Sequence, residues 1–376
     1  MDTLSITSVY QLIAWLSERH IPYEIAGTSN MGLPLIVIRK PGKGRPVMIT
    51  AGAHAMEPSG VSAALQILEN WHYDFPLYMM PLRDPLGCQS YETILSHTLN
   101  RPVHFEGHDE LSALLLKYAD EVYIRNELFL LVRIGERLFT NLHYRPEDAG
   151  PRQNERYINE YLDAHPEQLA AFSGRRVICP ANMAPNSETV HCYERAFTAE
   201  ISRTGIVADN NRRFGSDNEN PEVRVCRELC DEAKPGLVLD LHEGFSNTYY
   251  FFTSNYTGNP EAQKYVDSMN EACAREFPAG PWRLSDLISY MPECSTLYRE
   301  PAPGVLESIP SPDAKLPKVL GSGFTEYASR YCPSTTIEAG NDASLAQRVK
   351  VHMICAGAAL DRYAKEQTER GTISCR

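Results

Sequence analysis

Two side chains suited to metal chemistry, His54 and Glu57, stand three residues apart in the sequence. The apolar run Val47–Ile49 predicts a buried strand just before them, and Pro58 marks a position where a helix can start. The pair is therefore expected in the crevice between the C-terminal end of a strand and the N-terminus of a helix, where open α/β sheets bind ligands. One imidazole and one carboxylate supply two of the three ligands of a catalytic zinc site of the His₂Glu type.

Two more ionisable side chains stand at the ends of predicted strands. His242 follows the apolar run Leu237–Leu241, and Glu338 follows Ser334–Ile337. Because the C-terminal ends of parallel strands lie along one edge of a sheet, both side chains can meet the first pair in space although they are distant in the sequence.

Together these four residues match the needs of zinc-assisted hydrolysis. His54, Glu57 and His242 are predicted to bind one Zn²⁺ per chain and to leave one position open for water, whose pKa the metal lowers toward about 7. A carboxylate that is not a ligand must take the proton from water and pass it to the leaving nitrogen, and Glu338 is predicted in this role. Asp240 is interpreted either as a hydrogen-bond partner of the imidazole of His242 or as part of a core ion pair.

The motifs around these residues resemble those of the zinc carboxypeptidase family, including the related succinylglutamate desuccinylase/aspartoacylase group. The resemblance lies in His-x-x-Glu at 54–57, Asp-Leu-His at 240–242, and Glu338 within Thr-Ile-Glu-Ala-Gly. It implies an α/β fold with a mixed, largely parallel sheet flanked by helices, and it implies hydrolysis of an amide bond.

A fourth motif, Asp-Asn-Asn-Arg-Arg-Phe at 209–214, resembles the Asp-x-Asn-Arg segment of the family. By this resemblance Asn211 and Arg212 would bind a carboxylate of the substrate, a task that suits a planar guanidinium with two parallel donors. Arg203 is similar in placement to the arginine that polarises the scissile carbonyl in the deacylase branch, and this similarity implies a catalytic role. The turn at 84–87, Asp-Pro-Leu-Gly, is loosely similar to the Asn-Pro-Asp-Gly turn of the family.

The chain also departs from the family pattern. Arg213 stands where carboxypeptidases usually have a second Asn, and Met56 stands where digestive carboxypeptidases have Arg. The motifs do not identify the tyrosine that many members place near the substrate; Tyr298 and Tyr327 are both candidates. These departures concern the recognition of the substrate and leave the predicted metal ligands unaffected.

The rhythm of strands and helices divides the chain into two parts. Short apolar runs alternate with helical patterns up to about residue 87 and again after residue 200, which predicts an α/β core at 1–87 and 200–376. Between them the sequence is rich in Arg, Tyr and Glu and has no such alternation. We expect an inserted subdomain at 88–199, with a hairpin at 128–140, and long loops at 278–330.

Charge and cysteine content exclude several classes of function. The net charge of −12 and the absence of a long basic run argue against nucleic acid and anionic membrane as partners. No stretch reaches the roughly 18 consecutive apolar residues of a membrane span, and the N-terminus has no secretory pattern. The ten cysteines form no Cys-x-x-Cys pair, which favours reduced, buried thiols in a cytoplasmic protein.

The sequence thus predicts a zinc-dependent amide hydrolase of metallocarboxypeptidase type, whose substrate is a small peptide with a free carboxylate beside the scissile bond. An N-acyl amino acid deacylase of the succinylglutamate desuccinylase/aspartoacylase type is the alternative. A non-catalytic binding protein that retains the fold, and a structural protein with a buried ion-pair cluster, are alternatives of other classes. The oligomeric state is not encoded in these motifs.

Overall fold

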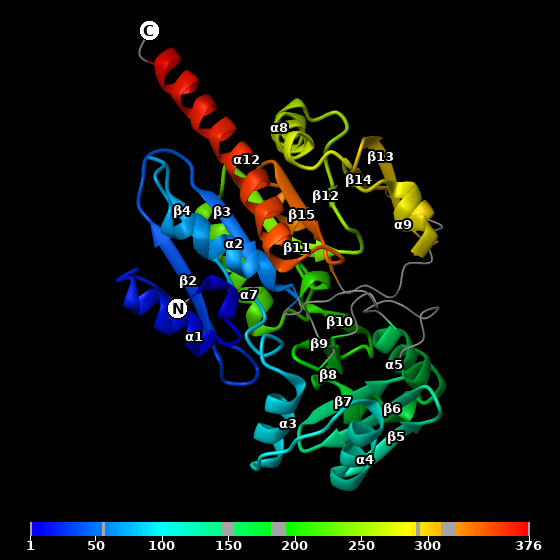
Figure 1. Ribbon diagram of the computed structural model, residues 1–376. Helices are drawn as coiled ribbons and strands as arrows, with labels where there is room; N and C mark the ends of the chain where they lie inside the picture. The colour runs from blue at the N-terminus through cyan, green and yellow to red at the C-terminus, as the bar shows by residue number, and fades with distance from the viewer. Residues whose placement is uncertain are drawn as a thin grey trace.

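Two β-sheets of unequal size organise the chain in the computed structural model (Figure 1), which describes residues 2–54, 57–143, 153–181, 193–290, 294–309 and 321–374. The larger sheet has nine strands and the smaller has six. The larger one is formed by the two ends of the chain, and the smaller one by the segment between them.

The nine-stranded sheet has the order β1-β2-β4-β3-β11-β15-β12-β14-β13. Its central strands β4, β3, β11 and β15 are parallel, and β12 pairs in parallel with β14, whereas the other four pairings are antiparallel. The predicted mixed sheet is therefore confirmed, with its parallel part at the centre. Its strands are β1 (Glu24–Thr28), β2 (Pro34–Lys40), β3 (Val47–Ala51), β4 (Leu77–Met80), β11 (Leu237–Gly244), β12 (Tyr249–Thr253), β13 (Tyr298–Ala302), β14 (Val305–Ser308) and β15 (Ser334–Gly340).

Helices cover both faces of this sheet, because its central strands are apolar on both sides. Val47 and Ile49 pack in the core that contains residues of α1, α2, α8 and α12, whereas Met48 packs on the opposite face with residues of α7 and α11. Figure 1 shows α2 and α12 lying side by side across one face of the central strands. The helices are α1 (Val9–Glu18), α2 (Pro58–Glu69), α7 (Pro221–Ala233), α8 (Pro260–Glu276), α11 (Phe324–Ala328) and α12 (Leu345–Ser374).

The starts of three of these helices follow from their sequence. Proline occupies the first turn of α2, α7 and α8, where its missing N–H is not needed. The side chains of Asn220 and Asn259 cap α7 and α8 by accepting hydrogen bonds from backbone N–H groups of the first turn. The start of α2 has no such cap, and Glu57 stands at this position with its carboxylate directed elsewhere.

The six-stranded sheet has the order β10-β9-β8-β7-β6-β5 and is antiparallel except for the pair β7–β8. Helices α3 and α4 cover one face, and α5 and α6 cover the other. The predicted hairpin is confirmed as β6–β7. The elements are α3 (Tyr91–Leu99), α4 (His108–Tyr118), β5 (Glu121–Arg125), β6 (Phe129–Ile134), β7 (Arg137–Leu142), α5 (Gln153–Ala164), α6 (Leu169–Phe172), β8 (Arg176–Pro180), β9 (Ala196–Ile201) and β10 (Val207–Asp209).

Two sequence predictions need correction. The smaller sheet runs on to Asp209, beyond the predicted boundary at 199, because β9 pairs with β8 and β10 pairs with β9. The stretch 278–330 is not a series of long loops, because its described residues include α9 (Leu284–Tyr290), α10 (Cys294–Leu297), β13, β14 and α11.

The turn after β4 joins the two sheets. The backbone N–H of Arg83 donates to the carbonyl of Ala51 at the end of β3 over 3.0 Å. Thr198 in β9 donates through Oγ1 to Oδ2 of Asp84 over 2.6 Å. This turn therefore holds the smaller sheet against the C-terminal edge of the larger one.

Two expectations drawn from the composition, on membrane-spanning segments and on the cysteines, can be compared with the structure. No helix in the described part of the chain is both long and apolar enough to cross a bilayer. Every cysteine within the described ranges is buried, as predicted; Cys192 and Cys375 lie outside those ranges.

Candidate metal centre

His54 and Glu57 occupy the predicted crevice between β3 and α2. His54 lies in the turn that follows β3, and Glu57 directly precedes Pro58, the first residue of α2. Gly52 makes this turn possible, since it has a φ of +62° and a Cβ there would approach Cδ1 of Leu82 to 3.0 Å. The two side chains thus project from one short, tightly packed connection.

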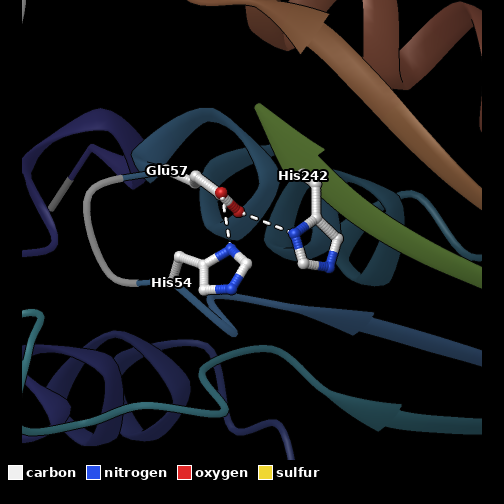
Figure 2. Close-up of side chains that lie close together, drawn as sticks. All are labelled: His54, Glu57 and His242. Carbon is white, nitrogen blue, oxygen red and sulfur yellow. Dashed lines mark hydrogen bonds and ion pairs between the residues drawn. The ribbon is translucent and has the colours of Figure 1, made fainter. Parts of the chain in front are cut away.

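His242 on β11 completes the cluster shown in Figure 2. The imidazole rings of His54 and His242 have their centroids 5.1 Å apart. Nδ1 of His54 lies 2.8 Å from Oε1 of Glu57, and Nδ1 of His242 lies 2.9 Å from Oε2 of the same carboxylate. Each of the three residues offers one ligand atom, and these atoms lie within 4.8 Å of one another. Among the described residues, this is the group of His, Cys, Asp and Glu side chains that could hold a metal ion. The predicted convergence of the three side chains is therefore confirmed.

The second nitrogen of each imidazole faces an aspartate. Nε2 of His242 lies 2.8 Å from Oδ2 of Asp240, and Nε2 of His54 lies 3.4 Å from Oδ1 of Asp209. A proton on Nε2 interacts with the aspartate, so that the lone pair of Nδ1 is directed at Glu57 and at any cation beside it. Asp240 is thus a partner of His242, and it also forms a buried ion pair with Arg83, so both readings of this residue hold.

The electrostatics of the cluster favour a positive charge at its centre. Burial opposes protonation of His54, but Glu57 and Asp209 outweigh it and raise the pKa of that imidazole to about 9. Burial likewise opposes ionisation of Glu57, but the two imidazoles lower the pKa of its carboxyl group to about 2. The pKa of Asp240 is lowered in the same way, against its burial, by His242 and Arg83.

The donors fit a zinc-like cation. Oε2 of Glu57 is buried and lies 2.9 Å from Nδ1 of His242. A buried carboxylate oxygen in this situation is costly unless it meets a charge or a donor. Two imidazole nitrogens and one carboxylate are the ligands that a catalytic zinc site uses. His54, Glu57 and His242 can therefore hold one metal ion.

Glu338 lies beside this cluster without belonging to it. It is the register partner of His242 on the neighbouring parallel strand β15, so the two side chains lie on the same face of the sheet. The side chain is buried, and burial together with the charge of Glu57 raises the pKa of Glu338 to about 7, although His242 opposes this shift. Its position and its pKa suit a group that exchanges protons near neutral pH.

Tyr250 lies next to Glu338 and was not predicted. It is the register partner of Glu338 on the other side of β15. A Cβ at Gly244 would lie 1.9 Å from its hydroxyl oxygen and 3.0 Å from Oε2 of Glu338, so the missing side chain of this glycine makes room for both groups. Tyr327, one of the two predicted tyrosines, donates instead to Asp231 in α7 over 2.7 Å and has a structural role.

Asn211 and Arg212 lie in the single-turn 3₁₀ helix Asn210–Arg212, which begins directly after Asp209. Oδ1 of Asn211 accepts hydrogen bonds from Nη2 of Arg83 over 3.2 Å and from the backbone N–H of Phe324 over 3.0 Å. Arg212 is half-buried; burial acts to lower the pKa of its guanidinium, but Asp209 and neighbouring acidic groups outweigh it and raise that pKa. The structure thus places both residues next to the aspartate that faces His54.

Arg203 does not join the site, and its predicted catalytic role is wrong. It is exposed in the turn between β9 and β10. Asp209 pairs with Ala199 across this hairpin, so Arg203 lies four residues beyond the level of Asp209, at the closed end of the hairpin. The nine-residue interval between Arg203 and Arg212 therefore leads away from the metal centre.

Two charged residues near the site have structural roles. Arg213 is fully buried and donates to the backbone carbonyls of Ala208, Asn218 and Glu200. Glu243 accepts a hydrogen bond from the backbone N–H of Ser59 over 2.7 Å and forms an ion pair with Arg348 of α12. This carboxylate therefore anchors the start of α2, next to Glu57, rather than facing solvent.

A cavity among the described residues lies apart from the cluster. It has a volume of about 880 Å³ and lies where α1 and α3 approach one another, with Leu4, Tyr10, Leu33, Ile94 and Arg137 among its lining residues. None of the three ligands lines it, so the chemistry of the metal centre gives no reason to place the substrate there.

Comparisons with known proteins give a likeness of fold. No protein-family model matches the chain, and no curated protein matches it. A proposed metallopeptidase from Shewanella amazonensis is 14% identical with a TM-score of 0.46, covering 96% of this chain and 94% of its own. A second, from Shewanella denitrificans, is 12% identical with a TM-score of 0.49, covering 96% and 92%.

Carboxypeptidase A from Helicoverpa armigera is 14% identical with a TM-score of 0.44, covering 96% of this chain and 75% of its own. The likeness is to metallopeptidases. At these low values it carries no argument about activity, which depends on the side chains described above.

Proposed function

We propose that the chain is a zinc-dependent amide hydrolase of carboxypeptidase type, which cleaves the bond next to a substrate carboxylate. The observation that supports this proposal is the convergence of Nδ1 of His54, Nδ1 of His242 and the carboxylate of Glu57, with Glu338 in register beside them. Three ligands and a separate buried carboxylate form the minimal set for hydrolysis at a metal centre.

His54, Glu57 and His242 would hold one Zn²⁺ per chain, which supplies Lewis acidity when it is bound. Asp209 and Asp240 orient the two imidazoles through their Nε2 atoms. The carboxylate of Glu57 is buried and ionised, and it is held at the start of α2, where the anchor between Glu243 and Ser59 limits its movement.

Glu338 would take the proton of the attacking water and deliver it to the leaving nitrogen. A base is most effective when its pKa lies near the operating pH, and the pKa of Glu338 is raised to about 7. Glu338 on β15 is the register partner of His242 on β11, so its side chain lies on the same face of the sheet as this ligand.

Arg212, assisted by Asn211, would bind the substrate carboxylate and so place the scissile amide in front of the ligands. The guanidinium bonds the carbonyl of Asn211 through one Nη1 contact of 2.7 Å, which leaves further donors for a carboxylate. The substrate would be a small peptide or, in the alternative, an N-acyl amino acid. Because Arg203 is remote, the residue that carried the likeness to deacylases is absent from the site, and this favours the peptidase.

A cytoplasmic setting is part of the proposal. The cysteines of the described chain are all buried, as thiols in a reducing compartment commonly are.

The test of the proposed function is a substrate panel assayed on purified protein. The panel contains dipeptides, D-linked and γ-linked peptides and N-acyl amino acids, with and without 1,10-phenanthroline. We expect release of a C-terminal residue from peptides with a free carboxylate, loss of this activity with the chelator, and recovery with Zn²⁺. A non-catalytic binding protein would bind zinc and cleave nothing, and a structural ion-pair cluster would contain no stoichiometric metal.

A further inference from the structure

Arg83 occupies a central position between the two sheets that the proposed reaction leaves unexplained. It lies in the turn after β4 and is almost completely buried, with 1% of its surface exposed. Its guanidinium lies 5.1 Å from the ring centroid of Phe214 and 5.2 Å from that of Phe324. Contacts with two aromatic rings fix the plane of a guanidinium and hence the directions of its donors.

One donor of Arg83 reaches the metal ligands. Nη1 donates to Oδ2 of Asp240 over 2.9 Å, and this same oxygen lies 2.8 Å from Nε2 of His242. The other oxygen, Oδ1, accepts a hydrogen bond from Oγ1 of Thr50 over 2.6 Å. The carboxylate that orients His242 is therefore held from two sides, by Arg83 and by Thr50.

The other donor reaches the segment that carries Arg212. Nη2 donates to Oδ1 of Asn211 over 3.2 Å. The same oxygen accepts a hydrogen bond from the backbone N–H of Phe324 at the start of α11. Asn211 follows the last strand of the six-stranded sheet, so this contact joins the smaller sheet to the carboxylate that orients a ligand in the larger one.

We propose that Arg83 is a positioning residue that couples the metal centre to the substrate-binding segment. One arm of its guanidinium holds His242 through Asp240, and the other holds Asn211 and with it the adjoining Arg212. The inference rests on the proposed function, because it assigns a purpose to a contact between the metal ligands and the residues that would bind the substrate carboxylate.

A purely structural ion pair would need only one of these two arms. Burying a charged pair is weak evidence for stability, because the cost of removing both groups from water offsets their attraction. The second arm ends on a neutral amide, where it adds little stability but fixes a loop. If both arms act, the affinity for metal and the affinity for a carboxylate ligand are linked, and each ligand strengthens the binding of the other by the same factor.

The test uses the full chain with two variants of Arg83 in the Glu338→Gln background, which prevents turnover of the probe. Zinc affinity is measured by competition with a chelator, and the affinity for N-acetyl-L-phenylalanine is measured by calorimetry with and without Zn²⁺. Arg83→Met removes both arms, and we expect a loss of zinc affinity of roughly 10–100-fold together with weaker binding of the probe. In Arg83→Met we also expect the affinity for zinc and the affinity for the probe to become independent of each other.

Arg83→Lys keeps the charge but has no planar fork and reaches only one partner at a time. We expect this variant to retain most of the zinc affinity while binding the probe more weakly, and it serves where Arg83→Met fails to fold. Thr50→Val is the matched control, because it removes the opposite hydrogen bond of Asp240 without touching Asn211. This control should lower zinc affinity and leave the linkage between zinc and probe intact.

The outcomes separate this inference from the proposed function. If the parent protein binds no zinc in stoichiometric amount, the proposed function fails. If the parent binds zinc and both Arg83 variants keep its zinc affinity, probe affinity and linkage, the positioning role is overturned even where their unfolding midpoints drop. If Arg83→Lys restores both affinities and the linkage fully, charge alone suffices, and the proposed coupling through the fork is also overturned.

Discussion

The two sheets contribute to the candidate site in different ways. The nine-stranded sheet supplies the metal ligands and Glu338 from the C-terminal ends of β3, β11 and β15. The six-stranded sheet supplies no ligand, but its last strand ends in Asp209, and the residues predicted to bind substrate follow immediately. In the proposed function, the larger sheet would provide the reaction chemistry, and the smaller one would provide recognition.

The difference lies in how each part reaches the site. His242 and Glu338 are neighbours in adjacent parallel strands, and only 2% of the side chain of His242 is exposed. Asp209 and the turn after it approach from the other sheet, and the contact from Asp209 to His54 is longer, at 3.4 Å. We therefore expect substitutions in the larger sheet to remove metal or turnover, and substitutions in the smaller sheet to change mainly affinity.

The largest effect is expected from His242→Ala. It removes a buried ligand from the centre of the sheet, so zinc content after dialysis should fall far below one equivalent and hydrolysis should be lost. The measurement is elemental analysis of the purified variant, with circular dichroism to check that the fold is retained. A folded variant that still holds one equivalent of zinc would remove His242 from the ligand set.

Glu338→Gln should abolish turnover without loss of metal. Removing a general base typically costs about 10²–10⁴-fold in rate, and the amide keeps the shape of the side chain. The measurement is kcat together with zinc content, and Glu271→Gln on the exposed face of α8 is the control. Persistent activity in the Glu338 variant would mean that another group takes the proton.

The two aspartates allow a direct comparison of the sheets. Asp240→Asn weakens the contact with Nε2 of His242, and Asp209→Asn weakens the contact with Nε2 of His54. Losing such a partner of a ligand imidazole costs roughly 10–100-fold in metal affinity. We expect the larger loss for Asp240, which is fully buried and closer to its imidazole, at 2.8 Å. Equal losses in chelator competition, or a larger one for Asp209, would break the proposed division between the sheets.

Arg212→Ala should raise KM and leave kcat little changed. Truncating one partner of a buried charge pair costs at least about 2 kcal/mol. Because the side chain of Arg212 is half-buried, we expect a loss near this lower limit, about 2 kcal/mol in kcat/KM. Substrates whose terminal carboxylate is amidated form the control, since they should bind equally to both proteins. An unchanged KM for the free carboxylate would assign its recognition to another residue.

The smallest effect is expected on stability in the metal-free protein. The pKa of Glu338 is raised from its ordinary value of 4.5 to about 7, so between these values the folded chain binds more protons than the unfolded chain. Its contribution to stability is therefore present at low pH, decreases as the pH rises from about 4.5 to about 7, and is constant above that. Denaturation midpoints of the parent should show this decrease relative to Glu338→Gln, and parallel pH profiles would contradict it.

The three ligands and Glu338 could be predicted from the sequence because they all follow apolar runs. Val47–Ile49, Leu237–Leu241 and Ser334–Ile337 are local signals of buried strands, and a general rule places the ends of parallel strands together. No such rule applies to Asp209 or Arg83, whose roles depend on how the second sheet packs against the first. The residues next to Asp209 and Arg83 in the sequence form no pattern that predicts a contact between the two sheets.

The wrong predictions have the same origin. The boundary at 199 cut through β9 and left out β10, because the pairing of Arg176 with Glu200 joins segments that are distant in the sequence. A catalytic role was assigned to Arg203 because of its spacing from Arg212. The intervening residues, however, form a hairpin, and Arg203 lies at the closed end of this hairpin. Tyr250 was missed because its approach to Glu338 depends on the register of two strands.

The central claim is that one metal ion lies among His54, Glu57 and His242. The most direct measurement is an anomalous difference map at the zinc absorption edge, from crystals grown with one equivalent of Zn²⁺. The account predicts a single strong peak about 2.0–2.2 Å from both Nδ1 atoms and from the carboxylate of Glu57. A map with no peak at this position, or with its peak at other side chains, would contradict the account.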